Sequence, residues 1–230
     1  MSKLARRLGL VAMAFWIGFA PSLSADAQVP PEPRDDSPWF EDITAIAGVD
    51  QPHQTRRFDN PYAHIMEGYT ALGASASIAD YDLDGFEDVF FTRSNTEGEN
   101  LLFRNRGDLT FEEVGEAAGV AHGNDRRNAS ADSLWFDLEG DGDPDLLVVR
   151  FGQNLLYENL AEQRETSSDP VRFVDITRRA GLEGRFNCIV AIAFDYDLDG
   201  DLDLFLGNYF APVDLFDPKT PRFFPESFET

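Results

Sequence analysis

Three short stretches of the chain are crowded with acidic residues in one spacing. They read DYDLDGFED at 80–88, DLEGDGDPD at 137–145 and DYDLDGDLD at 195–203, and we refer to them as the first, second and third acidic loops. Their first residues are Asp80, Asp137 and Asp195, so the stretch recurs after 57 and then 58 residues. Recurrence at a fixed period indicates a repeat architecture, in which each period forms one structural unit.

Two further phrases recur in the same order around these loops. One precedes each loop, at 40–49 (FEDITAIAGV), 111–120 (FEEVGEAAGV) and 173–182 (FVDITRRAGL). The other follows the first two loops, at 100–105 (NLLFRN) and 154–159 (NLLYEN). No such phrase follows the third loop, so the chain stops within a repeat. We therefore expect the natural protein to continue beyond Thr230.

Each acidic loop lies between two short apolar runs that favour β-structure. The runs before the loops are ASIAD (76–80), SLWFD (133–137) and VAIAFD (190–195), and those after them are DVFFTR (88–93), DLLVVRF (145–151) and DLFLGNYF (203–210). β-branched and aromatic residues around a Gly-rich turn predict hairpins. The two recurring phrases would add two strands to each unit, with TAIAG and TRRAG forming a helical turn that ends at glycine. Units of four antiparallel strands predict an all-β fold of β-propeller blades over 39–210, about three in number and incomplete, because closed propellers need about four to eight.

The alternating carboxylates of the loops suit a hard cation. Positions one, three, five and nine of each loop carry Asp or Glu, and position seven can offer its backbone carbonyl. Glycine at position six (Gly85, Gly142, Gly200) permits the sharp bend. Oxygen ligands in a flexible loop favour Ca²⁺, and the absence of Cys and His from the loops argues against zinc and copper. The candidate ligands are Asp80, Asp82, Asp84, Phe86, Asp88, Asp137, Glu139, Asp141, Asp143, Asp145, Asp195, Asp197, Asp199, Asp201 and Asp203.

Two other interpretations of the loops differ in what they predict. An EF-hand would need Glu at position twelve and flanking helices, whereas Phe91, Val148 and Leu206 occupy that position between strands. Metal-free Asp-Gly turns are the simpler alternative. Five carboxylates within nine residues repel one another unless a cation compensates them, and a turn does not require so many. We therefore expect about three structural Ca²⁺ sites.

The N-terminus has the pattern of an export signal. Lys3, Arg6 and Arg7 precede the apolar run 8–20, and an A-x-A pattern ending at Ala27 predicts cleavage before Gln28. An uncleaved anchor or a buried helix is the alternative, and the Arg pair leaves open twin-arginine export. Residues 28–38 form a Pro-rich linker. We expect a protein that is exported to the periplasm, the cell surface or the medium, with no membrane insertion after cleavage.

Charge and cysteine content limit the partners and the means of stabilisation. The formal net charge is −23, which disfavours nucleic acid because phosphate binding needs basic patches. Cys188 is the only cysteine, so no intramolecular disulfide is available, and a metal would serve as the cross-link in an exported protein. Because Cys188 lies in the apolar run CIVAIAF, we expect it to be a small buried core residue.

No constellation of catalytic residues emerges from the sequence. The histidines (His53, His64 and His122) lie in predicted loops without a nucleophile motif, and GASAS at 73–77 is better interpreted as the entry to a strand. Residues 51–68 form an insertion in the first repeat, and the tail 211–230 is rich in Pro and aromatic residues. This insertion and the tail, with Phe223, Phe224 and Phe228, are candidate contact surfaces, unless those rings pack against a neighbouring blade.

The D-x-D-x-D-G-x-x-D loop between apolar strands resembles the FG-GAP/VCBS repeat of integrin-α-type propellers. The FxD[IV]…AG[VL] and NLL[FY]xN phrases are similar to the branch that contains bacterial exported VCBS-repeat proteins and cartilage acidic protein, often with an ASPIC/UnbV domain. The resemblance covers about 39–210. It implies a propeller, typically seven-bladed, with Ca²⁺ held by the acidic positions of the hairpin loops.

Three functions remain open from the sequence. We favour a non-enzymatic, exported module that binds an extracellular protein or polysaccharide and in which Ca²⁺ is structural. The alternative is a carbohydrate-active enzyme of the lyase or dehydratase type on a calcium-stabilised propeller, which an unclaimed cluster of His, Tyr, Arg or carboxylates in a pocket would favour. A third possibility is a cell-surface adhesion scaffold.

Overall fold

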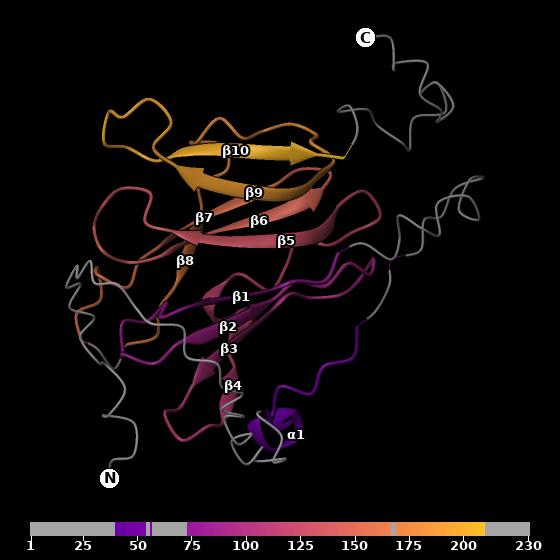
Figure 1. The fold of residues 1–230 in the computed structure, drawn as a ribbon, viewed down its shortest axis with the longest axis vertical. Coiled ribbons are helices and arrows are strands. Elements are labelled where there is room, and N and C mark those ends of the chain that lie inside the picture. The colour runs from indigo at the N-terminus through magenta and orange to yellow at the C-terminus, as the bar shows by residue number, and fades with distance from the viewer. Residues whose placement is uncertain (1–39, 54–55, 57–72, 167–168, 210–230) are drawn as a thin grey trace, which may run out of the picture. The chain divides into compact units, whose positions relative to one another are not determined.

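The computed structural model describes residues 40–53, 56, 73–166 and 169–209, and its helices and strands all belong to a unit that begins at Asp42 (Figure 1). A separate unit, Met1–Glu41, is described only at its last two residues. The predicted signal peptide, nearly all of the linker, most of the 51–68 insertion and the 211–230 tail lie outside the described residues. Among the described residues, no helix is both long and apolar enough to cross a membrane.

The described strands form three antiparallel sheets, ten strands in all. The first sheet has the order β1-β2-β3-β4, with β1 Ala76–Ala79, β2 Asp88–Phe91, β3 Leu101–Asn105 and β4 Phe111–Glu113. The second has the order β5-β6-β7-β8, with β5 Ala129–Phe136, β6 Asp145–Phe151, β7 Leu155–Asn159 and β8 Phe173–Asp175. The third pairs β9 Cys188–Phe194 with β10 Asp203–Asn208. The prediction of four strands per unit is confirmed for the first two units.

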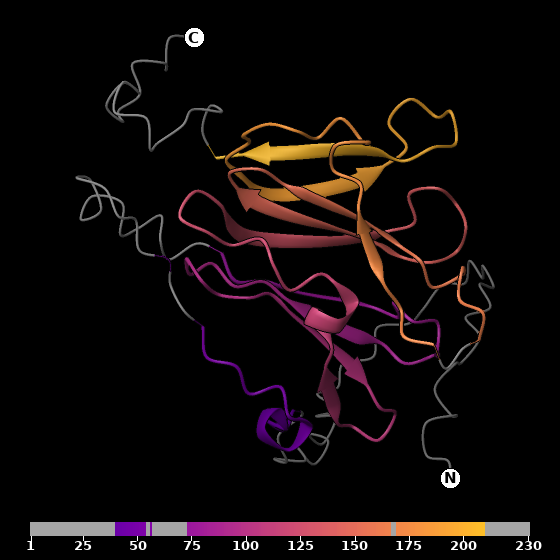
Figure 2. The same cartoon turned by 180° about the vertical axis from the view of Figure 1, so that it is seen from behind.

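The register of each hairpin places the acidic loop at its turn. The residue before position one pairs with position nine in all three hairpins, as Ala79↔Asp88, Phe136↔Asp145 and Phe194↔Asp203. The first strands of the sheets (β1, β5 and β9) lie side by side (Figures 1 and 2). The Ser77 and Ser133 hydroxyls join β1 to β5 at 2.7 Å. The hairpins are therefore stacked in chain order.

The first of the FxD[IV] phrases does not form the strand that the sequence predicts. Residues 40–43 are irregular, and Phe40 is 91% exposed, whereas its counterpart Phe173 in β8 is 7% exposed. A strand needs a neighbour to satisfy its backbone groups, and β4 and β8 have one in β3 and β7. Among the described residues, no strand pairs with 40–43.

The predicted helical turns after these phrases are largely confirmed. Helix α1 (Thr44–Ala47) ends at Gly48 with φ 79°, and α3 (Gly115–Ala118) ends at Gly119 with φ 90°. The third phrase forms a hydrogen-bonded turn rather than a helix, and it also ends at a glycine of positive φ, Gly181. Glycine suits these positions because it has no Cβ to clash in the left-handed region.

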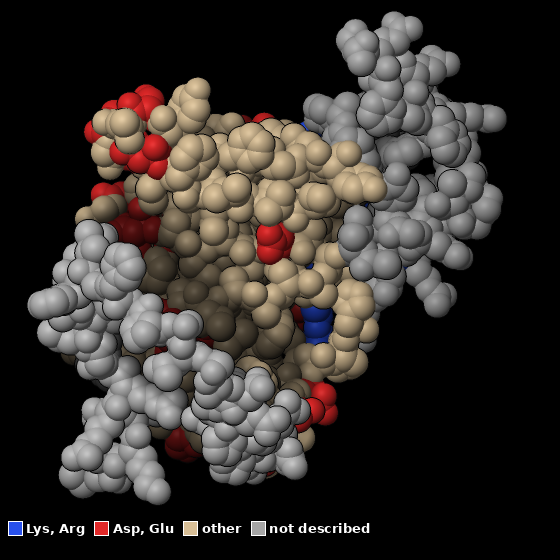
Figure 3. All heavy atoms as spheres, in the orientation of Figure 1, with Lys and Arg blue, Asp and Glu red and all other residues tan. Residues whose placement is uncertain are grey.

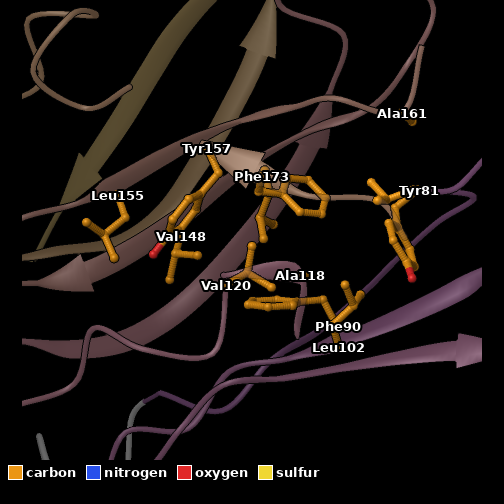
Figure 4. Close-up of a cluster of buried hydrophobic side chains, with 12 residues drawn as sticks. Tyr81, Phe90, Leu102, Ala118, Val120, Val148, Leu155, Tyr157, Ala161 and Phe173 are labelled. Atoms are coloured by element: carbon orange, nitrogen blue, oxygen red, sulfur yellow. The ribbon is translucent and has the colours of Figure 1, made fainter. Parts of the chain in front are cut away.

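Two hydrophobic clusters lie between successive sheets. The first joins Phe90 and Leu102 of the first sheet to Val148 and Phe173 of the second (Figure 4). The second joins Leu147 of β6 to residues of β9, among them Cys188, whose predicted burial is confirmed. Leu146, Leu147, Val148 and Val149 of β6 are all fully buried because apolar side chains cover both faces of this strand.

The third sheet exposes apolar side chains, in contrast to the second. Ile192 and Phe194 of β9 and Phe205 of β10 are between 43% and 58% exposed. Uncharged atoms dominate this part of the molecule in the space-filling view (Figure 3). The equivalent face of a complete unit is covered by the next sheet, and no described segment follows β10 to cover this one.

Candidate metal centre

The three acidic loops lie at the same edge of the stacked sheets (Figures 1 and 2). This placement follows from the topology, because each loop connects the first and second strands of its sheet and those first strands lie side by side. In the space-filling view, acidic atoms gather at the loop between β9 and β10 (Figure 3). All three loops that carry the predicted cation ligands therefore lie at one edge of the stacked sheets.

Position one of each loop organises the turn with its carboxylate. In the first loop, Asp80 accepts hydrogen bonds from the amides of Asp84 (3.0 Å) and Gly85 (2.9 Å). Asp137 accepts the same two bonds in the second loop, at 3.1 and 3.0 Å, and Asp195 in the third, at 3.2 and 3.1 Å. The loops thus share one backbone conformation, held by a side chain that is also a predicted ligand.

Position nine closes the loop from the other side. Asp88 accepts a hydrogen bond from the Tyr81 amide at 3.2 Å, and the equivalent bonds of the second and third loops measure 2.9 and 2.8 Å. Asp88 also accepts from the Asn105 amide at 2.7 Å, as Asp145 does from the Asn159 amide at 2.8 Å. The last Asn of the NLL[FY]xN phrase therefore anchors the acidic loop to the third strand.

Positions five and seven are joined within each loop. The carboxylates of Asp84, Asp141 and Asp199 accept from the amide two residues later, at 2.9, 3.3 and 3.0 Å. The position-seven carbonyls are the ligands that the sequence predicts there, and the side chains differ: Phe86 and Asp201 are exposed, whereas Asp143 is buried. Glycine at position six has φ of 90° to 98° in all three loops, which confirms the reason for its presence.

Position four also has a left-handed backbone, which the sequence analysis missed. Leu83 and Leu198 have φ of 56° and 63°, and Gly140 in the second loop has φ 73°. A leucine backbone in the left-handed region costs about 1–2 kcal/mol, a cost that glycine does not have. Glycine in one of three otherwise equivalent loops is the signal that could have revealed it.

Two of the loops bring three carboxylates together. In the first, Asp80, Asp82 and Asp88 offer oxygens that all lie within 4.8 Å of one another, and Asp195, Asp197 and Asp203 do the same in the third. These are positions one, three and nine. Hard oxygen ligands at this spacing suit Ca²⁺, which takes carboxylates, carbonyls and water together.

The second loop has a different arrangement at position three. The longer Glu139 side chain is hydrogen-bonded to Asp145, and loss of solvent around this pair and the bond itself raise the pKa of Glu139 to about 7. Among the described residues, the second loop forms no group of three carboxylates as close as those of the other two. Position three is therefore the point at which the second loop differs from the first and third.

Buried carboxylate oxygens without partners show that the site fits a cation. Asp82 is 6% exposed and its Oδ1 has no hydrogen-bond partner; Asp143 is 1% exposed and its Oδ1 has none either. Burial raises the pKa of both residues, and it raises the pKa of Asp88 to about 7. A buried carboxylate oxygen without a donor is costly, and a bound divalent cation would supply the positive charge that these oxygens lack.

A polar cavity lies at the other end of the hairpins. It has a volume of about 360 Å³ and is lined by Glu97, Glu99, His122, Asp125 and Arg126, among others. Its walls come from the β2–β3 connection and the segment after α3, and the Asn124 amide holds them together by donating to the Arg93 carbonyl at 2.6 Å. His122 Nδ1 lies 3.5 Å from Glu99 Oε1. The sequence places His122 in a predicted loop, but no motif in it links His122 to Glu99 or Asp125.

The profile of the FG-GAP-like repeat matches the chain twice, at residues 80–148 and 137–206, which together cover more than half of its length. The chain belongs to the FG-GAP-like repeat family. A search among curated proteins found no match.

The limits of the FG-GAP-like repeats agree with the structure. Each match begins at position one of an acidic loop, at Asp80 and at Asp137, and ends within the β-strand that follows the next loop. The FG-GAP-like repeat therefore spans one acidic loop, the rest of its sheet and the next hairpin. Each match therefore includes two acidic loops and strands of two successive sheets.

Proposed function

We propose that this protein is an exported, calcium-binding β-propeller module of the FG-GAP-like repeat family that binds an extracellular protein or polysaccharide. One observation carries the proposal. The same pattern of hydrogen bonds recurs within each of the three acidic loops, and in two of them the carboxylates of positions one, three and nine converge. The first two sheets are antiparallel four-stranded blades in this proposal, and the loops bind the ions that hold each hairpin turn in place.

Calcium has a structural role in this proposal. The residues that would hold it are positions one, three, five and nine, with the backbone carbonyl of position seven, and the ion would neutralise their mutual repulsion. An ion present at ten times its dissociation constant adds about 1.4 kcal/mol of stability at each site. Two or three such sites form a large share of the stability of a domain whose unfolding costs about 5–15 kcal/mol.

The proposal also includes secretion of the protein and its membership of the VCBS branch of the family. The charged N-terminus, apolar run and A-x-A pattern of residues 1–27 support secretion, and extracellular Ca²⁺ is abundant enough for sites with dissociation constants of about 10⁻⁴–10⁻³ M. The FxD[IV]…AG[VL] and NLL[FY]xN phrases support membership of the VCBS branch, whose members often carry an ASPIC/UnbV domain. The net charge of −23 makes nucleic acid an unfavourable partner.

A thermal melt with matched variants tests the metal part of this proposal. We expect the melting temperature to fall when a chelator replaces millimolar Ca²⁺, and the fall to shrink in Asp82→Asn and in Asp197→Asn. Glu87→Gln is the control. Glu87 is exposed and occupies position eight, so this substitution removes the same charge without removing a predicted ligand. Equal melting temperatures with Ca²⁺ and with chelator would refute it. Binding of the calcium-loaded protein to an array of polysaccharides and extracellular proteins then identifies the partner.

The cavity at the other end of the hairpins favours a second candidate function, a carbohydrate-active enzyme. Its carboxylates and His122 are not used by the acidic loops, and polar groups around a space of about 360 Å³ suit a hydroxylated ligand. Incubation of the protein with uronic-acid polysaccharides, with unsaturated products followed by ultraviolet absorbance, distinguishes the two. Turnover that is lost in His122→Ala would establish the enzyme, and binding without turnover would support the module.

A further inference from the structure

One short segment of the second sheet contacts both the first and the second acidic loops. It runs from Asn159, the last residue of β7, to Arg164, and all of it precedes β8. The two loops belong to different sheets and are separated by about fifty residues of sequence. A segment that is bonded to both is a physical route by which one loop can affect the other.

Asn159 makes the first of these connections and is fully buried. Its side-chain amide donates to the Pro144 carbonyl in the second loop and to the Tyr81 carbonyl in the first, both at 2.9 Å. Its backbone amide donates to Asp145, the position-nine carboxylate of the second loop, at 2.8 Å. One residue thus fixes position two of the first loop and positions eight and nine of the second.

Glu162 and Arg164 make the second connection. The Glu162 amide donates to the Asp143 carboxylate, at position seven of the second loop, at 3.0 Å. The Arg164 guanidinium donates to the backbone carbonyl of Asp82, at position three of the first loop, at 2.5 Å, and its Nε donates to the Ala161 carbonyl at 3.0 Å. Arg164 therefore holds the backbone of Asp82, whose side chain carries the buried oxygen without a hydrogen-bond partner in the first loop.

The other loops show what this segment adds. Asn105, the counterpart of Asn159, donates its side-chain amide to the Glu87 carbonyl in its own loop at 3.0 Å. Asp197, the counterpart of Asp82 in the third loop, is exposed, and the structure describes no segment that follows β10 to cover it. The burial of Asp82 thus comes with the neighbouring sheet and is not a property of the loop alone.

We propose that the segment 159–164 couples the first and second metal sites, so that an ion at either site favours an ion at the other. This inference rests on the proposed calcium binding. An ion in the second loop fixes Asp143 and Asp145, and through them the segment that holds Asp82 in place. The first site is then assembled before its own ion arrives, and the entropic cost of ordering it is already met. By linkage the effect is reciprocal.

A site-resolved calcium titration tests this coupling. Gly85 and Gly142 donate to the position-one carboxylates of the two loops, so their backbone amide signals in ¹⁵N NMR report the two sites separately. All proteins carry Asp195→Asn to silence the third site. We expect Asp137→Asn, which weakens the second site, to raise the Ca²⁺ concentration that half-saturates the Gly85 signal by about fivefold or more, the lower range of measured couplings.

A matched pair of arginine variants identifies the route. Arg164→Gln removes the bond to the Asp82 carbonyl, and Arg178→Gln removes the same charge from an exposed ion pair with Glu183 that lies in a different turn. We expect Arg164→Gln to weaken the first site and to reduce the effect of Asp137→Asn, with the remainder carried by Asn159, and Arg178→Gln to leave that effect intact. Arg164 is half-buried and outside both hydrophobic clusters, so its replacement spares the core.

The outcomes separate this inference from the proposal on which it rests. A Gly85 titration that is unchanged by Asp137→Asn would show that the sites fill independently, which overturns the coupling and leaves calcium binding intact. An effect of Asp137→Asn that is as large with Arg164→Gln as with Arg178→Gln would overturn the route through Arg164. If neither glycine signal responds to millimolar Ca²⁺, both the coupling and the calcium proposal fail.

Discussion

The carboxylate of Asp88 and the backbone amide of Asn105 are joined by a hydrogen bond of 2.7 Å, and Asp145 and Asn159 repeat it at 2.8 Å. The bond links the end of an acidic loop to the end of the third strand, seventeen and fourteen residues away in sequence. It accounts for two recurring motifs at once. The final Asp of the loop and the final Asn of the NLL[FY]xN phrase hold each four-stranded sheet together at the edge that carries the acidic loops.

Replacing Asp88 by Asn is expected to lower the melting temperature both with and without calcium, for different reasons. The amide has one acceptor oxygen where the carboxylate has two, so either the Tyr81 or the Asn105 backbone amide loses its buried partner, and the calcium-free protein should melt at a lower temperature than the native one. The gain in melting temperature on adding Ca²⁺ should fall, because the first site loses a charged ligand. Glu87→Gln, in which the neighbouring exposed residue loses its charge, is the control. An undiminished calcium gain in Asp88→Asn would contradict the assignment of Asp88 as a ligand.

The raised pKa of Asp88 predicts a pH dependence with a definite sign. Burial raises this pKa from 3.8 to about 7, so the native state keeps the proton in a range where the unfolded chain has lost it. The contribution of Asp88 to the stability of the calcium-free protein therefore falls as pH rises from about 4 to about 7, and it is constant above. Calcium displaces that proton, so its apparent affinity should rise across the same interval.

Melting temperatures measured in calcium-free buffer between pH 4.5 and 8 check this, with Asp88→Asn as the comparison. The native protein should lose more stability than Asp88→Asn over this interval, because only the native protein must ionise the buried group. Parallel curves for the two proteins would show that Asp88 titrates normally and would remove the physical basis for the prediction.

Position four of the loops offers a stabilising substitution. Leu198 has φ 63° and is 86% exposed, so Leu198→Gly relieves the left-handed strain and loses little packing. We expect the free energy of unfolding to rise by up to about 1 kcal/mol in the calcium-loaded protein, and Gly140→Ala in the second loop to lower it by a similar amount. Urea titrations measure both. Destabilisation by Leu198→Gly would mean that its side chain contributes more than its backbone strain costs.

The two-sided burial of β6 predicts its sensitivity to truncation. Leu147→Ala should lower the free energy of unfolding by about 2–5 kcal/mol, because a fully buried leucine leaves a cavity that its neighbours only partly fill. Val174 of β8 is 47% exposed, so Val174→Ala should lower the free energy of unfolding by less than about 1 kcal/mol. Similar losses for the two variants would contradict the packing of β6 against the third sheet.

The sequence predicts the hairpins and their turns well because each rests on local chemistry. The apolar runs around Asp80 and Asp137 specify strands, and glycine at position six specifies the bend. Features that depend on contacts with other strands or sheets could not be predicted from the local sequence. Phe40 stands where Phe111 and Phe173 stand in the strands β4 and β8, yet residues 40–43 are irregular and no strand of the described part of the chain pairs with them. The burial of Asp82 could not be inferred from its loop, because Arg164 and Asn159 come from the next sheet.

The second loop shows the same limit within a single motif. Its pattern of acidic residues matches the other two, and the sequence therefore predicts three equal sites. The one additional methylene of Glu139 lets its carboxyl group reach Asp145, and the second loop lacks the close group of three carboxylates that the other two have. One side-chain carbon thus distinguishes three loops that the sequence pattern treats as alike.

The central claim is that the acidic loops bind calcium, and isothermal calorimetry of the protein with CaCl₂ tests it most directly. We expect saturation at about three ions per molecule, with dissociation constants of about 10⁻⁴–10⁻³ M, and much weaker binding of Mg²⁺. Asp82→Asn and Asp197→Asn should each remove about one ion, and Glu87→Gln should remove none. An absence of heat at millimolar Ca²⁺, or binding that is unchanged in both ligand variants, would contradict the account.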